Sequence, residues 1–426
     1  MMTDSLDLKL SLLNDPQLLP RLEEFISLNA DEDPVKLRFK LIKAEMPAGE
    51  RSFIDFALLQ LEATKKYSSK ISSSLRLLYP SMLAGEQASN SEVSDFHSML
   101  IAGAMSLLDM TAGLGIDFIT MAKAISPTGK NCVAVELDPL KALVLELNLR
   151  RNGLTDAKVV CGDSIKVLSQ LRDESRRFDV IFVDPARRDD EGGRIYDPAH
   201  CQPDVVGNAG LLFDVTERVI VKNSPMVDVS KALQIFPFTE RLYLVSVRNE
   251  CKELLTEMRA GARLKSLTAV DIHSSGNRQL TEVDTDSVGR QYTESHIDEP
   301  TLRSWLEEGH VWIYEPSATL MKLASWNDLA RRFGLKKGSP NSHIFFSREF
   351  HEDFPGRVLL IERILDKKGM KELKGEPRNV VTRNYPLKAE PLSKKLRVNS
   401  GDDRFIYGLT ISPDEHPMLL DTIICW

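Results

Sequence analysis

The chain has 426 residues, which is too long for one ordinary hydrophobic core and predicts two or three domains. Its apolar share of 42% and charged share of 27% are typical of soluble globular proteins, and no run approaches the roughly 18 apolar residues of a membrane span. The net charge of −7 argues against a wholly cationic nucleic-acid binder.

The first residues and the cysteines predict a cytoplasmic protein. The start, Met-Met-Thr-Asp-Ser-Leu-Asp, lacks the basic and then apolar layout of a secretory signal. The five cysteines are scattered without a C-x-x-C pair, and two of them lie in strand-like apolar runs, so we expect reduced, buried thiols rather than disulfides or a metal cluster. The eight histidines show no metal-ligand spacing, and no metal is predicted.

Residues 1–77 are predicted to form a helical region. Apolar residues recur at helical spacing in 20–26 and 53–62, and the Ser-rich segment 68–74 predicts a connector.

From Leu107 onward, apolar strands alternate with helices. Strands separated by helices indicate a parallel sheet that is covered on both faces. We therefore predict a Rossmann-like α/β domain over residues 78–275. Its strands are predicted at 107–110, 132–137, 159–160, 180–183, 219–221 and 242–247, with helices at 139–151 and 164–171.

The alternation ends near Asp271. A small α+β linker domain over 276–320 and a second α+β domain over 321–426 are predicted. Residues 321–426 hold 19 Lys and Arg against 14 Asp and Glu, a net of +5, whereas the rest of the chain carries −12. Two interpretations stay open: a surface that attracts a polyanion, and an ordinary solvated surface.

A glycine turn follows the first strand, in Leu107-Leu-Asp-Met-Thr-Ala-Gly-Leu-Gly-Ile-Asp-Phe. Gly113 and Gly115 permit tight turning and the close approach of a ligand to the backbone. A dinucleotide site prefers G-x-G-x-x-G, but Phe118 stands at the third position, which disfavours a dehydrogenase. Asp109 at the strand end would repel a phosphate, yet it suits the cationic aminoacyl end of S-adenosylmethionine.

Two further acids end the next two strands. Glu136, 21 residues after Gly115, can accept both ribose hydroxyls, and Asp163 can accept the adenine amino group. Each acid alone is more often a helix cap or a solvated loop residue. Three acids at successive strand ends indicate one ligand site, because ligands bind at the carboxyl ends of such sheets. The predicted S-adenosylmethionine site comprises Asp109, Thr111, Ala112, Gly113, Gly115, Glu136, Leu137, Asp163, Ser164 and Asp184.

The fourth strand ends in Val183-Asp-Pro-Ala-Arg-Arg. Here the chain resembles the class I S-adenosylmethionine-dependent methyltransferases, whose nucleic-acid branch often carries Asp/Asn-Pro-Pro-aromatic at this strand end. The resemblance implies that Asp184 and Pro185 hold a base amino group. Ala186 and Arg187 depart from the motif at its second proline and its aromatic residue.

Arg187 therefore has two interpretations. Its guanidinium stacks on a base or holds a phosphate, or it forms a structural ion pair with Asp189 or Asp190. Stacking of a base on an aromatic residue is worth about 1–3 kcal/mol, so the departure changes how a base is held. The residues that the resemblance implies for the reaction are Asp184, Pro185 and Arg187.

The fifth strand, Val219-Ile-Val-Lys-Asn-Ser-Pro, is similar to a turn of the uracil-C5 RNA methyltransferases. Those enzymes attack the base with a cysteine just before the proline. Ser224 stands at that place, so the cysteine-adduct route is not supported. Lys222 and Ser224 either line the pocket or form an ordinary strand end.

The whole chain resembles a bacterial methyltransferase family with a C-terminal THUMP-like domain. THUMP domains are associated with RNA binding, so the resemblance implies a structured RNA that is methylated at a base nitrogen, and a THUMP-like RNA-binding domain at 321–426. The segments that carry the likeness are 53–66, 80–89, 314–322, 332–337 and 354–357.

Positive residues of the C-terminal region would contact phosphates without reading the bases. Phe333, Phe345 and Phe346 lie near them in the sequence, and we expect these rings in a packed core. The candidate phosphate contacts are Lys336, Lys337, Arg357, Lys367, Lys368, Lys394, Lys395 and Arg397.

Two other functions stay open. One is methylation of protein or DNA, since amide nitrogens and DNA bases can use a similar acid at the fourth strand. The other is a non-catalytic module that binds the cofactor and RNA. The sequence indicates neither the particular RNA nor the oligomeric state.

Overall fold

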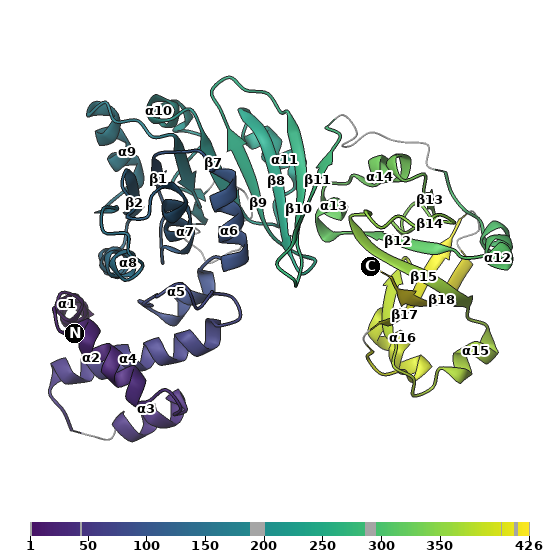
Figure 1. Ribbon diagram of the computed structural model, residues 1–426, viewed down its shortest axis with the longest axis horizontal. Coiled ribbons are helices and arrows are strands. Elements are labelled where there is room, and N and C mark those ends of the chain that lie inside the picture. The colour runs from purple at the N-terminus through teal and green to yellow at the C-terminus, as the bar shows by residue number, and fades with distance from the viewer. Residues whose placement is uncertain are drawn as a thin grey trace. The chain divides into compact units, whose positions relative to one another are not determined.

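The computed structural model describes residues 2–42, 45–187, 201–285, 295–401, 403–412 and 416–425. The chain forms two compact units (Figure 1). The first unit comprises Met1–Glu240 and Glu253–Arg263, and the second comprises Arg241–Lys252 and Leu264–Trp426.

The first unit contains a helical region followed by an α/β sheet. Its helices are α1 (Met2–Leu13), α2 (Leu18–Leu28), α3 (Pro34–Ile42), α4 (Ala48–Tyr67), α5 (Met82–Gln87), α6 (Ser91–Leu100), α7 (Ile116–Ile125), α8 (Pro139–Arg151), α9 (Ser164–Asp173), α10 (Ala209–Val215) and α11 (Val229–Ile235). Its strands are β1 (Leu107–Asp109), β2 (Cys132–Glu136), β3 (Lys158–Cys161), β4 (Val180–Val183), β5 (Ala186–Arg187), β6 (Cys201–Gln202), β7 (Val219–Asn223) and β9 (Glu250–Met258).

The predicted N-terminal helical region is present as α1 to α4. Leu18, Leu22 and Phe53 bury their side chains in one cluster, which also includes Val144 of α8. The helical region therefore packs against a helix of the α/β sheet and shares a core with it.

Five parallel strands form the centre of the first unit, in the order β3-β2-β1-β4-β7. All five were predicted, and the doubly wound α/β arrangement agrees with the prediction. The sheet is not wholly parallel, however, because β9 pairs antiparallel with β7. Sequence reasoning missed β9 because charges interrupt its apolar pattern. Two of these charged residues, Glu253 and Glu257, are buried in ion pairs.

Alternation along the strands directs side chains to both faces of the sheet. Val133 and Ile181 share a core cluster with Leu168 of α9 and Leu212 of α10. On the other face, the ring of Phe182 contacts His97 of α6 at 5.1 Å between centroids, and α6 packs on α7. Helices thus cover both faces, and the loops at the carboxyl ends of the strands remain accessible to a ligand.

The second unit is an α+β structure, as predicted. Strands β8 (Thr239–Val247), β10 (Ser266–Ile272) and β11 (Arg278–Val283) form a three-stranded group in which β10 is parallel to β8 and antiparallel to β11. A seven-stranded sheet has the order β13-β14-β12-β15-β18-β17-β16. The remaining elements are α12 (Glu299–Glu308), β12 (Trp312–Pro316), α13 (Ala318–Lys322), α14 (Trp326–Arg332), β13 (Lys336–Lys337), β14 (Phe345–Ser347), β15 (Gly356–Ile364), α15 (Lys367–Glu372), β16 (Asn379–Arg383), α16 (Ala389–Leu396), β17 (Arg404–Ile411) and β18 (His416–Ile424).

Two predicted domain boundaries fall inside hydrogen-bonded structure. The boundary at 275 lies in the turn between the paired strands β10 and β11, and the boundary at 320 lies within α13. The polar composition of a turn between strands resembles that of a linker between domains, and a helix as short as α13 gives little periodic signal. The sequence therefore did not show that the chain continues through paired structure at these two places.

Two further expectations concern the burial of the cysteines and the absence of a membrane span. All five cysteines are free, but only Cys132 is buried, whereas Cys161 on the edge strand β3 and Cys425 are exposed. Burial was therefore wrong for these two thiols. Within the described part of the chain, no helix combines the length and the apolar character needed to cross a membrane.

Asn148 on α8 is fully buried and joins three parts of the first unit. Its Oδ1 accepts from the backbone N–H of Leu78 at 2.6 Å, and its Nδ2 donates to the carbonyls of Leu78 and Leu114 at 3.1 and 3.2 Å. Leu114 belongs to the glycine turn after β1, so one side chain ties that turn to α8 and to the connector after α4.

We expect Asn148→Ala to lower the free energy of unfolding by at least about 2 kcal/mol, because each buried polar group left unpaired costs about 1–3 kcal/mol. Calorimetric unfolding measures the change. Glu146→Ala on the same helix is the control, since Glu146 is half-buried with 42% of its side chain exposed and pairs with the exposed Arg150 at 3.9 Å, so its loss should cost less than about 0.5 kcal/mol. Equal stability of the two variants would contradict the bridging role of Asn148.

Candidate active site

The turn between β1 and α7 requires glycine at one position above all. Gly115 has φ +93°, and a Cβ there would lie 2.4 Å from Cδ1 of Leu145 on α8. Gly113 has φ +54°, but an added Cβ would meet only open space and the carbonyl of Thr111 at 3.9 Å. The turn therefore packs its backbone directly on α8, and the first residues of α7 follow at once.

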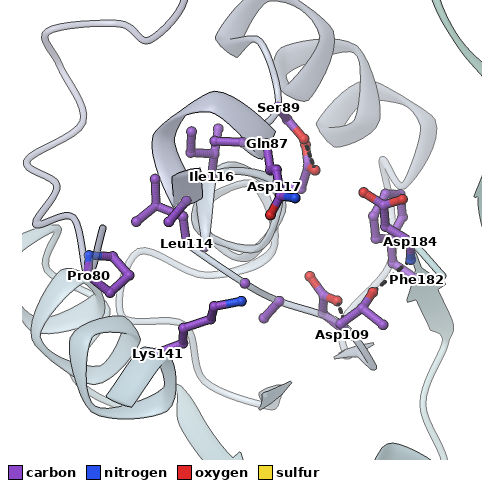
Figure 2. A pocket seen from close by; sticks show the side chains of 16 residues that line it. Pro80, Gln87, Ser89, Asp109, Leu114, Ile116, Asp117, Lys141, Phe182 and Asp184 are labelled. Carbon is purple, nitrogen blue, oxygen red and sulfur yellow. Dashed lines mark hydrogen bonds between the residues drawn. The ribbon is translucent and has the colours of Figure 1, made fainter. Parts of the chain in front are cut away.

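A pocket opens beside this turn at the carboxyl edge of the sheet (Figure 2). It brings together six of the predicted residues: Asp109, Thr111, Ala112, Gly113, Gly115 and Asp184. The other lining residues are Pro80, Ala84, Gln87, Ala88, Ser89, Leu114, Ile116, Asp117, Lys141 and Phe182.

Four predicted cofactor residues do not line the pocket. Glu136 is linked to it, because its carboxylate accepts from the N–H of Gly113 at 3.1 Å and from the N–H of Asp138 at 2.9 Å. Leu137 leaves about half of its side chain exposed at the end of β2. The role of Glu136 toward the ribose and that of Leu137 in cofactor binding stay predictions.

Asp163 caps helix α9, and Ser164 is the first residue of that helix. The Oδ1 of Asp163 accepts from the N–H groups of Ile165 and Lys166, both at 3.0 Å. The capping interpretation of Asp163 is therefore correct. Its predicted contact with an adenine amino group stays a prediction.

Asp109 is buried at the end of β1 with 2% of its surface exposed. Its Oδ1 accepts from the N–H of Thr111 at 2.9 Å. Burial raises the pKa of Asp109 to about 8, and the negative charges of Asp117 and Asp184 act in the same direction. A cation bound in the pocket would favour the ionised carboxylate.

The acids of the pocket suit a cationic group of the ligand. Asp109, Asp117 and Asp184 line the pocket, and Lys141 extends from α8 toward the glycine turn (Figure 2). Asp117 and Asp184 are paired with other side chains, whereas Asp109 accepts only a backbone N–H among the contacts described for it. S-adenosylmethionine carries a sulfonium, an ammonium and one carboxylate, and a carboxyl at the place of Asp109 suits its cationic end better than a pyrophosphate.

Lys222, at the end of β7, connects Asp184 to the interior. Its Nζ lies 2.8 Å from Oδ2 of Asp184, 2.8 Å from Oγ of Ser89 and 3.5 Å from Oδ2 of Asp117. Lys222 does not itself line the pocket, but its three partners Ser89, Asp117 and Asp184 do. Ser224, by contrast, accepts from the N–H of Met226 at 3.2 Å in the turn that follows β7.

The ion pairs continue behind Asp117. His97 of α6 is 1% exposed, and its Nδ1 lies 2.9 Å from Oδ1 of Asp117. Its Nε2 lies 2.5 Å from Oε1 of the buried Glu253 on β9. The five groups Glu253, His97, Asp117, Lys222 and Asp184 alternate in charge, and we call them the charge relay.

Each charged group of the relay favours the ionised form of its neighbours. Burial would lower the pKa of His97, but Glu253 and Asp117 raise it to about 10. Burial would also lower the pKa of Lys222, but Asp184 and Asp117 raise it. Burial would raise the pKa of Asp117, but Lys222 and His97 hold it well below its usual range. His97 and Lys222 are therefore cations at neutral pH.

Two of the three residues predicted for the reaction occupy the expected strand end. Asp184 lines the pocket, and its N–H donates to Oγ1 of Thr111 at 2.7 Å. Pro185 follows directly, before β5. Arg187 is described by its backbone alone, in β5, while Asp189 and Asp190 lie outside the described residues. The role of Arg187 stays a prediction.

Sequence reasoning missed His97, Asp117 and Glu253. No short motif joins them, since they come from α6, α7 and β9. The only local signal is Lys222, a lysine that directly follows three apolar strand residues.

The comparisons with known proteins agree with the predicted class. Residues 66–191 match the family profile of the O-methyltransferases, and residues 312–355 match that of a ferredoxin-like domain. The chain thus contains an S-adenosylmethionine-dependent methyltransferase domain, whose cofactor is S-adenosylmethionine. The C-terminal match is ferredoxin-like, and the THUMP-like assignment stays a prediction.

Among solved structures, the chain is similar to a proposed methyltransferase from Porphyromonas gingivalis W83. The identity is 25% and the TM-score 0.77, over 97% of this chain and 99% of that protein. It is also similar, with 14% identity and a TM-score of 0.33, to an O-methyltransferase from Bacillus cereus in complex with SAH, over 46% of this chain and 96% of that one. None of the curated proteins matches the chain.

We expect cofactor binding to release a proton, because an ammonium beside Asp109 favours the ionised form of a carboxyl whose pKa is about 8. At pH 7, titration calorimetry in buffers of different ionisation enthalpy should show this release for the wild type. Between pH 6 and 8, affinity should rise by up to about tenfold per pH unit. Asp109→Asn should bind more weakly and release fewer protons. Equal proton release by both proteins would contradict the assignment.

Proposed function

We propose that the protein transfers the methyl group of S-adenosylmethionine to a base nitrogen in structured RNA. The observation that carries the proposal is the position of Asp184. This carboxylate lines the same pocket as the glycine turn and Asp109, so it lies beside the expected place of the cofactor.

Asp184 is suited to hold an amino group. Its side chain is 43% exposed, and Lys222 contacts Oδ2, so Oδ1 can accept a hydrogen bond from an acceptor in the pocket. Thr111 fixes the backbone of Asp184 through its Oγ1. A base amino group that donates to Oδ1 would be oriented toward the methyl group, and orientation is the main requirement of this reaction.

The two ionisable groups next to Asp184, Lys222 and Asp117, favour nitrogen over an aliphatic hydroxyl as the acceptor. A hydroxyl needs a base to remove its proton as it attacks. Lys222 has a raised pKa and Asp117 a lowered pKa, so neither takes up such a proton near neutral pH. A base nitrogen attacks through a lone pair and can lose its proton afterward.

A basic surface on the second unit supports RNA as the partner. Helices α15 and α16 lie side by side, because Leu373, Leu392 and Leu396 share a core cluster and the N–H of Gly375 donates to the carbonyl of Arg397 at 2.8 Å. We define the α15–α16 surface by its exposed cations, Lys367, Lys368, Lys371, Lys374, Lys394, Lys395 and Arg397. Clustered cations of this kind suit a phosphate backbone.

Three of the candidate phosphate contacts lie elsewhere. Lys337 is 2% exposed, so its assignment as a phosphate contact was wrong. Lys336 lies over the ring of Trp305, and the half-buried Arg357 bonds to Glu315 and Tyr407. The three phenylalanines near them, Phe333, Phe345 and Phe346, are buried in the core as expected.

An oxygen acceptor is the second candidate, because the matched family profile is that of O-methyltransferases. That match covers residues 66–191. Lys222, which holds Asp184, lies beyond the matched residues, so the match does not include this contact.

We expect tritium from labelled S-adenosylmethionine to enter RNA taken from cells that lack this gene. Asp184→Asn should lower the rate by at least about a hundredfold, since a positioned hydrogen-bonding group typically contributes about 10²–10⁴-fold. Glu146→Gln on α8 is the control and should retain the wild-type rate. Nuclease digestion then identifies the methylated nucleoside. Label at a ribose oxygen would select the second candidate, and label only in DNA or protein would contradict the RNA substrate.

We expect Lys367→Glu together with Lys368→Glu to weaken RNA binding by at least about tenfold at 50 mM salt, and to reduce the salt dependence of binding. Cofactor affinity should not change. The matched control is Lys130→Glu with Lys158→Glu, which makes the same change of charge at exposed positions of the first unit. Equal loss in both double variants would show an effect of net charge alone.

A further inference from the structure

We propose that Lys222 is a positioning residue for methyl transfer, which fixes the carboxylate of Asp184 and is itself held by Asp117, His97 and Glu253. The inference rests on the proposed role of Asp184 and assigns a function to the charge relay behind it.

The sheet places Lys222 beside Asp184. Strands β4 and β7 pair in parallel with Val183 opposite Val221, so the next residue of each strand lies at the same edge. Lys222 is 14% exposed, and all three of its acceptors are side-chain oxygens. Its ammonium group therefore has a defined position that does not depend on solvent.

Asp184 needs such a partner. It stands just beyond the last residue of β4, where its side chain is 43% exposed, and an isolated carboxylate there would rotate between several orientations. The contact with Lys222 selects one of them by holding Oδ2. The other oxygen, Oδ1, is then available to the acceptor without a further loss of freedom.

The position of Lys222 depends in turn on Asp117. The Oδ2 of Asp117 faces Lys222 and accepts from Ser89, while Oδ1 faces His97. Asp117 lies in the first turn of α7, where the helix dipole also favours a negative charge. His97 is held from its other side by Glu253, so both nitrogens of the ring are engaged.

The relay is therefore a continuous structure from β9 to the pocket. A simpler interpretation is that these ion pairs only stabilise the fold. The two interpretations differ in one respect, because a purely structural lysine would act on methyl transfer independently of Asp184.

A double-mutant cycle separates the two interpretations. The variants are Lys222→Met, Asp184→Asn and the double variant, assayed for kcat, for KM and for cofactor affinity. We expect Lys222→Met to lower kcat by about 10- to 100-fold, since a small misplacement of a reacting group can cost about a hundredfold. In the Asp184→Asn background the same change should lower kcat by less than about threefold, because the two side chains act together. Multiplicative losses would overturn the proposal.

Glu253→Gln tests the far end of the relay, with Glu257→Gln as its matched control. Both glutamates are buried on β9 in ion pairs, but Glu257 pairs with Arg218 and Arg259 outside the relay. We expect Glu253→Gln to lower kcat by about 3- to 10-fold, as a weaker effect transmitted through two neighbours, and Glu257→Gln to affect only the melting temperature. Equal effects of both on kcat would overturn the proposal.

The outcome for the wild type distinguishes this inference from the proposed function. Label only in DNA or protein overturns the RNA substrate, and the same cycle then tests Lys222 on the polymer that is labelled. No label in any polymer overturns both.

Discussion

Charge burial at the carboxyl edge of the sheet is the constraint on which the rest of the first unit depends. Asp117, His97, Lys222 and Glu253 are largely removed from water, and an unpaired charge in such a place is strongly destabilising. Each is tolerated because its neighbour has the opposite sign. The elements that carry them, α6, α7, β7 and β9, must therefore keep their register for any of these groups to remain charged.

This constraint also shapes the chemistry of the pocket. The cations in the relay stay protonated, and the carboxylate between them stays ionised, so the groups behind Asp184 act through fixed charge. Burial outweighs the effect of Lys222 on Asp109 and raises its pKa to about 8, which makes Asp109 the group that responds to a bound cation. The pocket thus contains side chains whose charge does not change near neutral pH and one carboxyl, that of Asp109, whose protonation state changes when a cation binds.

Much of the fold could be predicted from the sequence because local patterns determine it. The five parallel strands follow apolar runs, and the glycine turn follows from Gly113 and Gly115 between a strand and a helix. The helical N-terminal region follows from its apolar spacing. The strand β9 could not be predicted in this way, because Glu253 and Glu257 resemble solvated residues until the partners His97 and Arg218 are known.

The candidate site was predictable to a similar degree. Asp109 and Asp184 are marked by their places at strand ends, and the structure brings them to one pocket. The relay was not predictable, since its members are up to 156 residues apart and meet only through the sheet. Asp163 shows a different difficulty. An acid between a strand and a helix is expected both for a ligand contact and for a helix cap, so the sequence alone does not distinguish the two roles.

Helix α8 contacts both the N-terminal helices and the glycine turn. One side of it packs against the N-terminal helices through Val144, while Leu145 contacts the glycine turn and Asn148 is bonded to it. A substitution on α8 therefore meets two sets of neighbours at once. The N-terminal helices cannot be exchanged for an unrelated segment without also re-fitting the helix that supports the turn, so the two regions are bound to change together as the sequence diverges.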